Sequence, residues 1–151
     1  AQLSRGLGDV YKRQGKEIQK IGHEFGSTTG RSRRCGWLDL PALKYATMIN
    51  GITELVITKI DVLSSLEKIK VCTHYKYFGK KISHLPYDLN PKGIKPIYKE
   101  FKGWKKDITK ISNFEHLPLN LKNYIKYLEK EINIPIKIIS VGPDRNETIY
   151  R

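Results

Sequence analysis

The sequence predicts an α/β protein with a largely parallel sheet flanked by helices. Two runs of apolar and β-branched residues, LVIT at 55–58 and IKIISV at 136–141, have the pattern of strands buried on both faces. Segments with helical spacing alternate with them, most clearly at 118–132. Ligands of such proteins bind beyond the carboxyl ends of the strands, so the residues after these runs are the first site candidates.

The N-terminal part of the domain is expected to contain two helices joined by a polar loop. The first helix covers 16–24, and the glycine-bounded loop covers 26–36. Asp39 is placed to cap the second helix, which runs to residue 50. Gly51 ends that helix, because glycine readily adopts the left-handed conformation found at such ends.

The middle of the chain is expected to be mostly extended. A short helix at 62–66 leads into a strand at 69–78, in which apolar and polar side chains alternate. Gly79 then supplies the turn of a hairpin with a strand at 80–83. A further strand is expected at 94–101.

The helix at 118–132 has the most regular pattern of the chain. Its apolar side chains recur at spacings of three and four residues and therefore share one face, formed by Leu121, Tyr124, Ile125 and Leu128. We expect this face to be buried.

Residues 1–14 differ in character from the rest of the chain. The segment, AQLSRGLGDVYKRQ, has no sustained apolar period. It is interpreted either as a disordered terminus or as foreign sequence joined to the natural chain, and the second interpretation is favoured. The domain proper is expected to span residues 15–151.

The composition indicates a protein that binds anions. The chain has 151 residues, with 28 Lys and Arg against 15 Asp and Glu, for a formal net charge of +13. Phosphates, nucleotides and nucleic acids all suit such a charge. No run approaches the about 18 apolar residues of a membrane span, no secretory start is present, and the cysteines are too few for a disulfide scaffold. A cytoplasmic protein without membrane contact is expected.

The first strand end carries a candidate for guanine recognition. Lys59, Ile60 and Asp61 follow the run at 55–58. The two oxygens of an Asp carboxylate match the N1–H and 2-amino donors of guanine, whereas adenine presents an acceptor at N1. The stem of Lys59 would lie along the base. Alternatively, Asp61 simply caps the short helix that follows.

The second strand end offers small polar groups. Ser140, Val141 and Gly142 close the run at 136–141. A serine hydroxyl and a glycine amide at such a place bind the edge of a base or sugar with little steric obstruction. The alternative is an ordinary turn with Pro143 in its second position.

The loop at 26–36 is interpreted as a clamp for a small anion. Thr28 and Thr29 supply hydroxyl donors, and Gly30 lets the backbone approach a ligand. Arg31, Arg33 and Arg34 add guanidinium groups, which bind carboxylate and phosphate oxygens in pairs. A solvated basic loop and a nucleic-acid contact are the alternatives, but the remaining positive charge is spread along the chain rather than gathered in a stripe.

Other chemistry finds little support in the sequence. The four histidines lack the spacing of metal ligands, so no metal site is expected. The phosphate-binding motif GxxxxGK(S/T) does not occur. A chain that binds the base of a nucleotide but has no loop for its phosphates would be incomplete as a nucleotide enzyme.

Taken together, four segments resemble the C-terminal third of adenylosuccinate synthetases. They are GSTTGRSRRCGWLDL, ELVITKIDVLSSLEKIKVC, PIYKEFKGWKKDI and LPLNLKNYIKYLEKEINIPIKIISVGPDRNETI, in that order along the chain. The resemblance runs from about residue 15 to the end and does not include the first fourteen residues. It implies the C-terminal portion of a P-loop-NTPase-like synthetase fold. It also implies an enzyme that joins IMP to L-aspartate and hydrolyses GTP, giving adenylosuccinate, GDP and phosphate.

The resemblance assigns roles residue by residue. Arg31 matches a position that also contacts IMP, Arg33 matches one that reaches GTP, and Ile60 stands where the family usually has leucine. The aspartate-binding loop is matched by Ser27, Thr28, Thr29, Gly30, Arg31, Ser32 and Arg33. The GTP-binding positions are matched by Arg33, Lys59, Ile60, Asp61, Ser140, Val141 and Gly142.

The resemblance also implies that the catalytic centre lies elsewhere. In the family the general base, the general acid, the phosphate loop and the Mg²⁺ ligands lie in the N-terminal part, so no catalytic residue is assigned in this chain. We expect the isolated chain to be inactive and the full-length enzyme to be a homodimer. The competing hypotheses are a stand-alone guanine-nucleotide-binding module and a basic RNA-binding domain.

Overall fold

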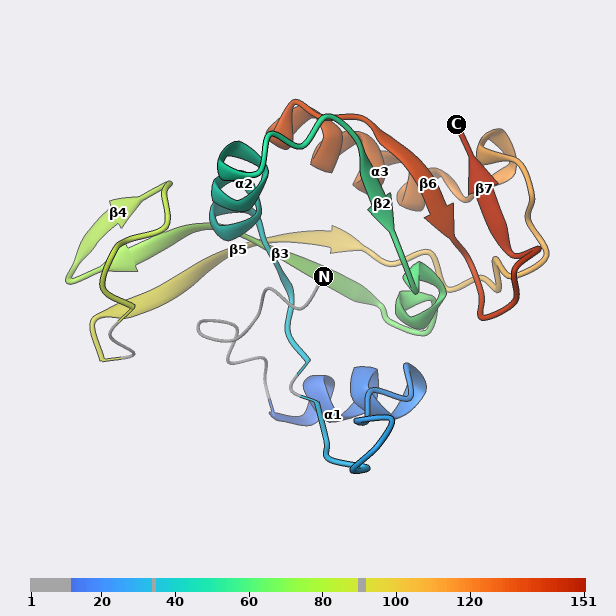
Figure 1. Cartoon of the computed structure of the whole chain (residues 1–151), viewed down its shortest axis with the longest axis horizontal. Helices are drawn as coiled ribbons and strands as arrows, with labels where there is room; N and C mark the ends of the chain where they lie inside the picture. Colours follow the sequence, from blue (N-terminus) through green and yellow to red (C-terminus); the bar gives the residue numbers. More distant parts are fainter. Residues whose placement is uncertain (1–11, 34, 90–91) are drawn as a thin grey trace. The chain divides into compact units, whose positions relative to one another are not determined.

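The computed structural model describes residues 12–33, 35–89 and 92–151, and the chain divides into two compact units (Figure 1). The first unit comprises Ala1–Ala46 and Lys70–Lys99, and the second comprises Thr47–Ile69 and Glu100–Arg151. Helices and strands occur together in the chain, so the predicted α/β class is confirmed.

The first unit contains a mixed sheet built around one long strand. Its helices are α1 and α2, and the central strand β3 pairs in parallel with β1, antiparallel with β4, and also with β5. The elements that lie wholly or mostly in this unit are α1 (Lys12–Ile21), β1 (Leu38–Asp39), α2 (Leu40–Ile49), β3 (Lys68–Tyr77), β4 (Lys80–Ile82) and β5 (Ile94–Lys102).

These elements follow the sequence predictions closely. The hairpin turn at Gly79 is present, and Gly79 has a φ of 88° that suits glycine. Helix α1 starts and ends a few residues earlier than the helix expected at 16–24. Of the segment 1–14, residues 1–11 lie outside the described part of the chain, and residues 12–14 belong to α1.

Asp39 joins the start of α2 to β3. Its Oδ1 accepts a hydrogen bond from the backbone N–H of Ala42 at 3.2 Å, which confirms the predicted capping role. The same oxygen accepts a hydrogen bond from the hydroxyl of Tyr75 at 2.6 Å. Both side chains are buried, and the loss of solvent raises the pKa of the Asp39 carboxyl. The two hydrogen bonds of Asp39 therefore link the first turn of α2 to β3.

The second unit combines a small sheet with a long helix. Strands β2 and β6 are parallel neighbours, and β7 pairs antiparallel with the other edge of β6. The elements of this unit are β2 (Leu55–Ile57), η1 (Ile60–Leu63), η2 (Phe114–His116), α3 (Leu119–Ile132), β6 (Ile136–Ser140) and β7 (Thr148–Tyr150).

Helix α3 buries the face that its sequence predicts. Leu121, Tyr124, Ile125 and Leu128 are all buried. The ring of Tyr124 meets that of Phe101 edge to face, with the ring centres 5.4 Å apart. This packing attaches the end of β5 to the helix within the second unit.

Three features differ from the sequence predictions. The short helix expected at 62–66 lies earlier in the chain, as the 3-10 helix η1 (Ile60–Leu63). The sheets are mixed rather than largely parallel, because β4 and β7 return antiparallel to their neighbours. The run at 55–58 is not buried on both faces, since Val56 is 56% exposed. Strand β2 lies at the edge of its sheet among the described strands, and Val56 is exposed between the half-buried Leu55 and Ile57.

Gly103 provides a test of the second unit's packing. A Cβ at this position would overlap the backbone carbonyl of Leu66, which cannot move aside easily. We expect Gly103→Ala to lower the free energy of unfolding by at least about 2 kcal/mol in urea denaturation of the purified chain. Gly51→Ala is the contrast, because Gly51 has a φ of 60° but open space around it. Its cost should be about 1 kcal/mol, and an equal cost for both variants would contradict the packing argument.

Candidate functional site

The parallel pairing of β2 and β6 brings the two predicted strand ends together. Leu55 lies opposite Ile136, and after a one-residue irregularity Ile57 lies opposite Ile139. Both strands run in the same direction, so both continue into loops at the same edge of the sheet. The segment that starts at Lys59 and the segment that starts at Ser140 therefore leave β2 and β6 side by side (Figure 1).

Lys59 has an unusual backbone conformation at this edge. Its φ of 57° and ψ of 35° place it in the left-handed region, and its side chain makes no capping hydrogen bond to η1. This conformation costs a residue with a Cβ about 1–2 kcal/mol relative to the right-handed form. Such strain concentrates at functional sites, because it turns the chain sharply where a ligand must be met. Here it turns the chain directly from β2 into η1.

Asp61 presents a carboxylate oxygen that has no protein partner among the described residues. Its Oδ1 is buried, and no hydrogen-bond donor contacts it. Loss of solvent raises the pKa of this carboxyl, and the charge of Glu147 raises it further. Hydrogen bonds from the backbone N–H groups of Asp61 and Val62, and the charge of Lys59, lower it. Asp61 also lies within η1, whereas Lys59 holds the N-cap position. Asp61 is therefore not the N-cap of η1, and its ligand-reading role stays a prediction.

Ile60 and Val141 lie in the apolar core. As whole residues, side chain and main chain together, they are 2% and 0% exposed, respectively. They therefore support the two strand ends from inside the core. Ser140, by contrast, donates its hydroxyl to the carbonyl of Gly142 at 3.0 Å.

The turn after β6 is held closed by a residue that the sequence reasoning missed. The backbone N–H of Val141 donates to the carbonyl of Glu147 at 2.9 Å. The backbone N–H of Glu147 donates to the carbonyl of Asp144 at 3.0 Å. No spacing motif points to Glu147, and only its position against the strand end shows its relevance.

The predicted aspartate loop forms a closed, exposed turn in the first unit. The N–H of Gly26 donates to the carbonyl of Arg31, and the N–H of Gly30 to the carbonyl of Gly26, both at 2.8 Å. Phe25 and Ser32 form an antiparallel bridge that closes the base. Gly30 has a φ of 63°, so glycine suits this corner.

The loop presents its polar side chains to solvent on one short turn. Ser27, Thr28, Thr29 and Arg31 are exposed. Arg33 is also exposed, and its guanidinium pairs with the carboxylate of Glu24 at 3.2 Å. The loop lies in the first unit, whereas both strand ends lie in the second. Arg34, the third arginine of the predicted clamp, lies outside the described residues.

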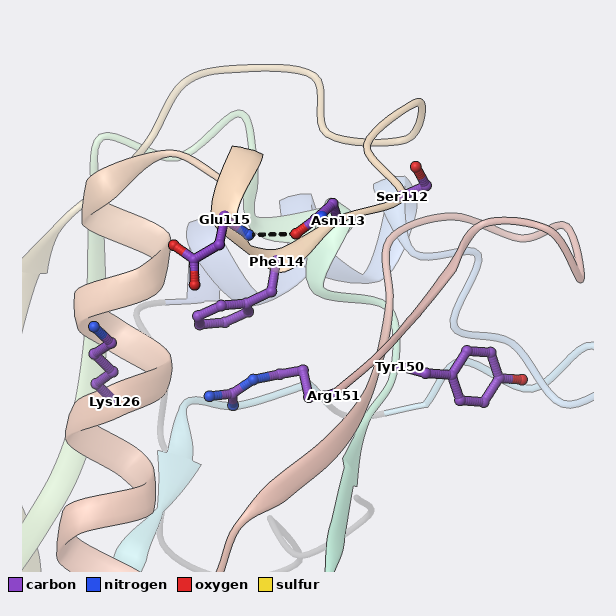
Figure 2. Close-up of a pocket in the computed structure, with 7 residues that line it drawn as sticks. All are labelled: Ser112, Asn113, Phe114, Glu115, Lys126, Tyr150 and Arg151. Atoms are coloured by element: carbon purple, nitrogen blue, oxygen red, sulfur yellow. Dashed lines mark hydrogen bonds between the residues drawn. The ribbon is translucent and has the colours of Figure 1, made fainter.

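A shallow hollow of about 420 Å³ lies elsewhere in the second unit, beside the end of β7 (Figure 2). Its Arg151 stacks on the ring of Phe114, 3.9 Å from the ring centre, and forms an ion pair with Glu129 at 2.8 Å. Tyr150 points away from Arg151 (Figure 2). The guanidinium is therefore already engaged within the protein, and the hollow contains none of the predicted site residues.

The described residues contain no helix long and apolar enough to cross a membrane. They also contain no group of three or more His, Cys, Asp or Glu placed to hold a metal ion.

Comparison with known proteins identifies the family. The family model described as adenylosuccinate synthetase matches residues 6–149, nearly the whole chain. The chain belongs to the adenylosuccinate synthetase family. The matched range extends into the segment 1–14, for which a foreign origin is predicted from the sequence.

Curated adenylosuccinate synthetases are closely similar to the chain. The enzyme of Flavobacterium johnsoniae is 55% identical over 143 residues, which is 95% of this chain and 34% of that protein. That of Flavobacterium psychrophilum is 59% identical over 137 residues, which is 91% of this chain and 32% of that protein. The chain thus spans about a third of the length of these relatives.

A solved structure shows the same arrangement. The fully ligated adenylosuccinate synthetase of Plasmodium falciparum superposes with a TM-score of 0.90 at 40% sequence identity. The match covers 96% of this chain and 35% of that structure. The comparisons support the synthetase resemblance and give no support to an RNA-binding module.

The strain at Lys59 leads to a stability test with matched variants. Both Lys59→Gly and Lys59→Ala remove the side chain, but only glycine accepts the left-handed conformation without cost. We expect the glycine variant to be more stable than the alanine variant by about 1 kcal/mol in urea denaturation. Equal stabilities, or a more stable alanine variant, would show that this backbone conformation is absent in solution.

Proposed function

We propose that the full-length protein joins IMP and L-aspartate with hydrolysis of GTP, forming adenylosuccinate, GDP and phosphate. The main supporting observation is that the two segments matched to GTP-binding positions leave the sheet at the same edge. At this edge Asp61 has a buried carboxylate oxygen, Oδ1, which accepts no hydrogen bond from the described residues. Family membership supplies the reaction, and this chain supplies part of its binding surface.

Guanine recognition is the role proposed for the second unit. An ionised Asp61 accepts hydrogen bonds from N1–H and the 2-amino group of guanine, a pairing that adenine cannot make. The main chain of Ile60 and the segment Ser140–Gly142 border the base, and the stem of Lys59 lies along it. The charge of Lys59 favours the ionised form of Asp61 that this recognition needs.

Aspartate recognition is the role proposed for the exposed loop of the first unit. The guanidinium of Arg31 suits a carboxylate of L-aspartate through two parallel hydrogen bonds and also contacts IMP. Thr28 and Thr29 add hydroxyl donors, and Ser27, Gly30 and Ser32 complete the loop. Arg33 contacts GTP, for which it must exchange its ion pair with Glu24.

The groups that carry out the reaction are proposed to lie in the part of the enzyme upstream of these segments. In the family pattern that part holds the general base, the general acid, the phosphate loop and the ligands of Mg²⁺. The described residues of this chain do not fit a Mg²⁺ site, so no step is assigned to the metal here. The proposed full-length protein is a cytoplasmic homodimer, and the isolated chain is inactive.

The direct experiment is an assay of the purified full-length protein. With IMP, L-aspartate, GTP and Mg²⁺ it should form adenylosuccinate, detected by its ultraviolet spectrum and by chromatography. No adenylosuccinate under these conditions would refute the proposed function.

Changing Asp61 tests the guanine assignment in that protein. Asp61→Asn replaces one carboxylate oxygen by an NH₂ donor and should raise KM for GTP about tenfold. Inosine triphosphate lacks the 2-amino group, so the preference for GTP over it should shrink in the same variant. Asp88→Asn, a change at an exposed carboxylate of the first unit, is the matched control and should leave both values unchanged. An unaltered GTP preference in Asp61→Asn would overturn the assignment.

Changing Arg31 tests the aspartate loop. Arg31→Leu removes the forked donor and should raise KM for L-aspartate at least about tenfold, while KM for GTP changes far less. Arg31→Lys keeps the charge without the fork and should lie between the two. A normal KM for L-aspartate in Arg31→Leu would count against the clamp.

A further inference from the structure

Glu147 lies against the end of β6, although it is not among the residues matched to GTP-binding positions. It lies one residue before β7 and folds back toward the end of β6. Its carboxylate Oε2 accepts a hydrogen bond from the backbone N–H of Asp144 at 2.9 Å. The main chain of Glu147 makes two more hydrogen bonds, with Val141 and Asp144. Three hydrogen bonds of this one residue therefore hold the turn closed.

The Glu147 side chain also lies directly on Gly142. A Cβ at Gly142 would overlap the Glu147 carboxylate, so the missing side chain is what allows the approach. Gly142 is itself buried, and its carbonyl accepts the hydroxyl of Ser140. The peptide groups proposed to border the base are therefore clamped between Ser140 on one side and Glu147 on the other.

The same carboxylate acts on Asp61 across the sheet edge. Of the charged groups that influence Asp61, Glu147 disfavours its ionised form and Lys59 favours it. Burial and the backbone N–H groups of Asp61 and Val62 also act on the pKa of the Asp61 carboxyl, so Glu147 is one of several influences on its ionisation. Glu147 thus contacts one recognition segment and influences the charge of the other.

We propose that Glu147 is a positioning residue for guanine recognition, which fixes the Ser140–Gly142 segment through its carboxylate and places a negative charge near Asp61. This inference rests on the proposed GTP-binding role of the two segments. Glu147 does not itself contact the base; it acts through Gly142 and Asp61.

Two variants of the full-length enzyme separate the two effects. Glu147→Ala removes both the brace and the charge, and should raise KM for GTP about fivefold while kcat and KM for L-aspartate stay near wild type. Glu147→Gln retains an oxygen that accepts the Asp144 N–H, so its KM for GTP at neutral pH should match wild type. Glu115→Ala, at an exposed carboxylate of η2, is the control and should match wild type throughout.

The pH profile supplies a readout that loss of packing would not give. Asp61 must be ionised to accept the guanine donors, and the negative charge of Glu147 raises its pKa. In Glu147→Gln that charge is gone, so the acid limb of kcat/KM for GTP should move to lower pH. This measurement keeps the test available even if Glu147→Ala fails to fold.

Two results would overturn the inference. One is an acid limb in Glu147→Gln that coincides with wild type, and the other is a folded Glu147→Ala enzyme with a normal KM for GTP. If either result is obtained while the wild-type enzyme uses GTP, the inference about Glu147 is wrong but the proposed function stands. A wild-type enzyme that does not use GTP refutes the proposed function itself, so the two failures are distinguishable.

Discussion

The parallel pairing of β2 and β6 is the constraint on which the candidate site depends. Only three residues of β2 take part, yet their register against Ile136, Ile138 and Ile139 determines which residues leave the sheet together. A shift by one position would turn the strand's side chains to opposite faces. It would also withdraw Asp61 from the end of β6. The buried side chains of Ile60, Ile139 and Val141 resist such a shift because each would leave the core.

The two strand ends solve the same geometric problem by different means. After β2 the chain turns at once through the left-handed backbone of Lys59, which needs no partner side chain but carries local strain. After β6 it turns through a hydrogen-bonded loop in which Gly142 gives room and Glu147 gives closure. The first device leaves an oxygen of Asp61 without a protein donor, whereas the second satisfies its polar groups internally.

Much of this arrangement follows from sequence patterns, and the exceptions have physical causes. The strand at 136–141, the buried face of α3 and the capping of α2 by Asp39 are local features, and all three are confirmed. Strands β1 and β7 contain only two and three residues, so pairing rather than propensity defines them. The exposure of Val56 depends on which strands lie beside β2. The roles of Glu147 and of the Glu24–Arg33 ion pair depend on contacts in space that no spacing encodes.

The exposed face of Val56 on an edge strand has a practical consequence for work with the purified chain. Among the described strands β2 lies at a sheet edge, and an edge strand with an exposed apolar side chain is a template for a second copy of the same strand. Concentrated solutions should therefore tend toward strand-to-strand association through β2. Lysine at this position is the kind of gatekeeper that natural edge strands use, and it would oppose such association without touching the core.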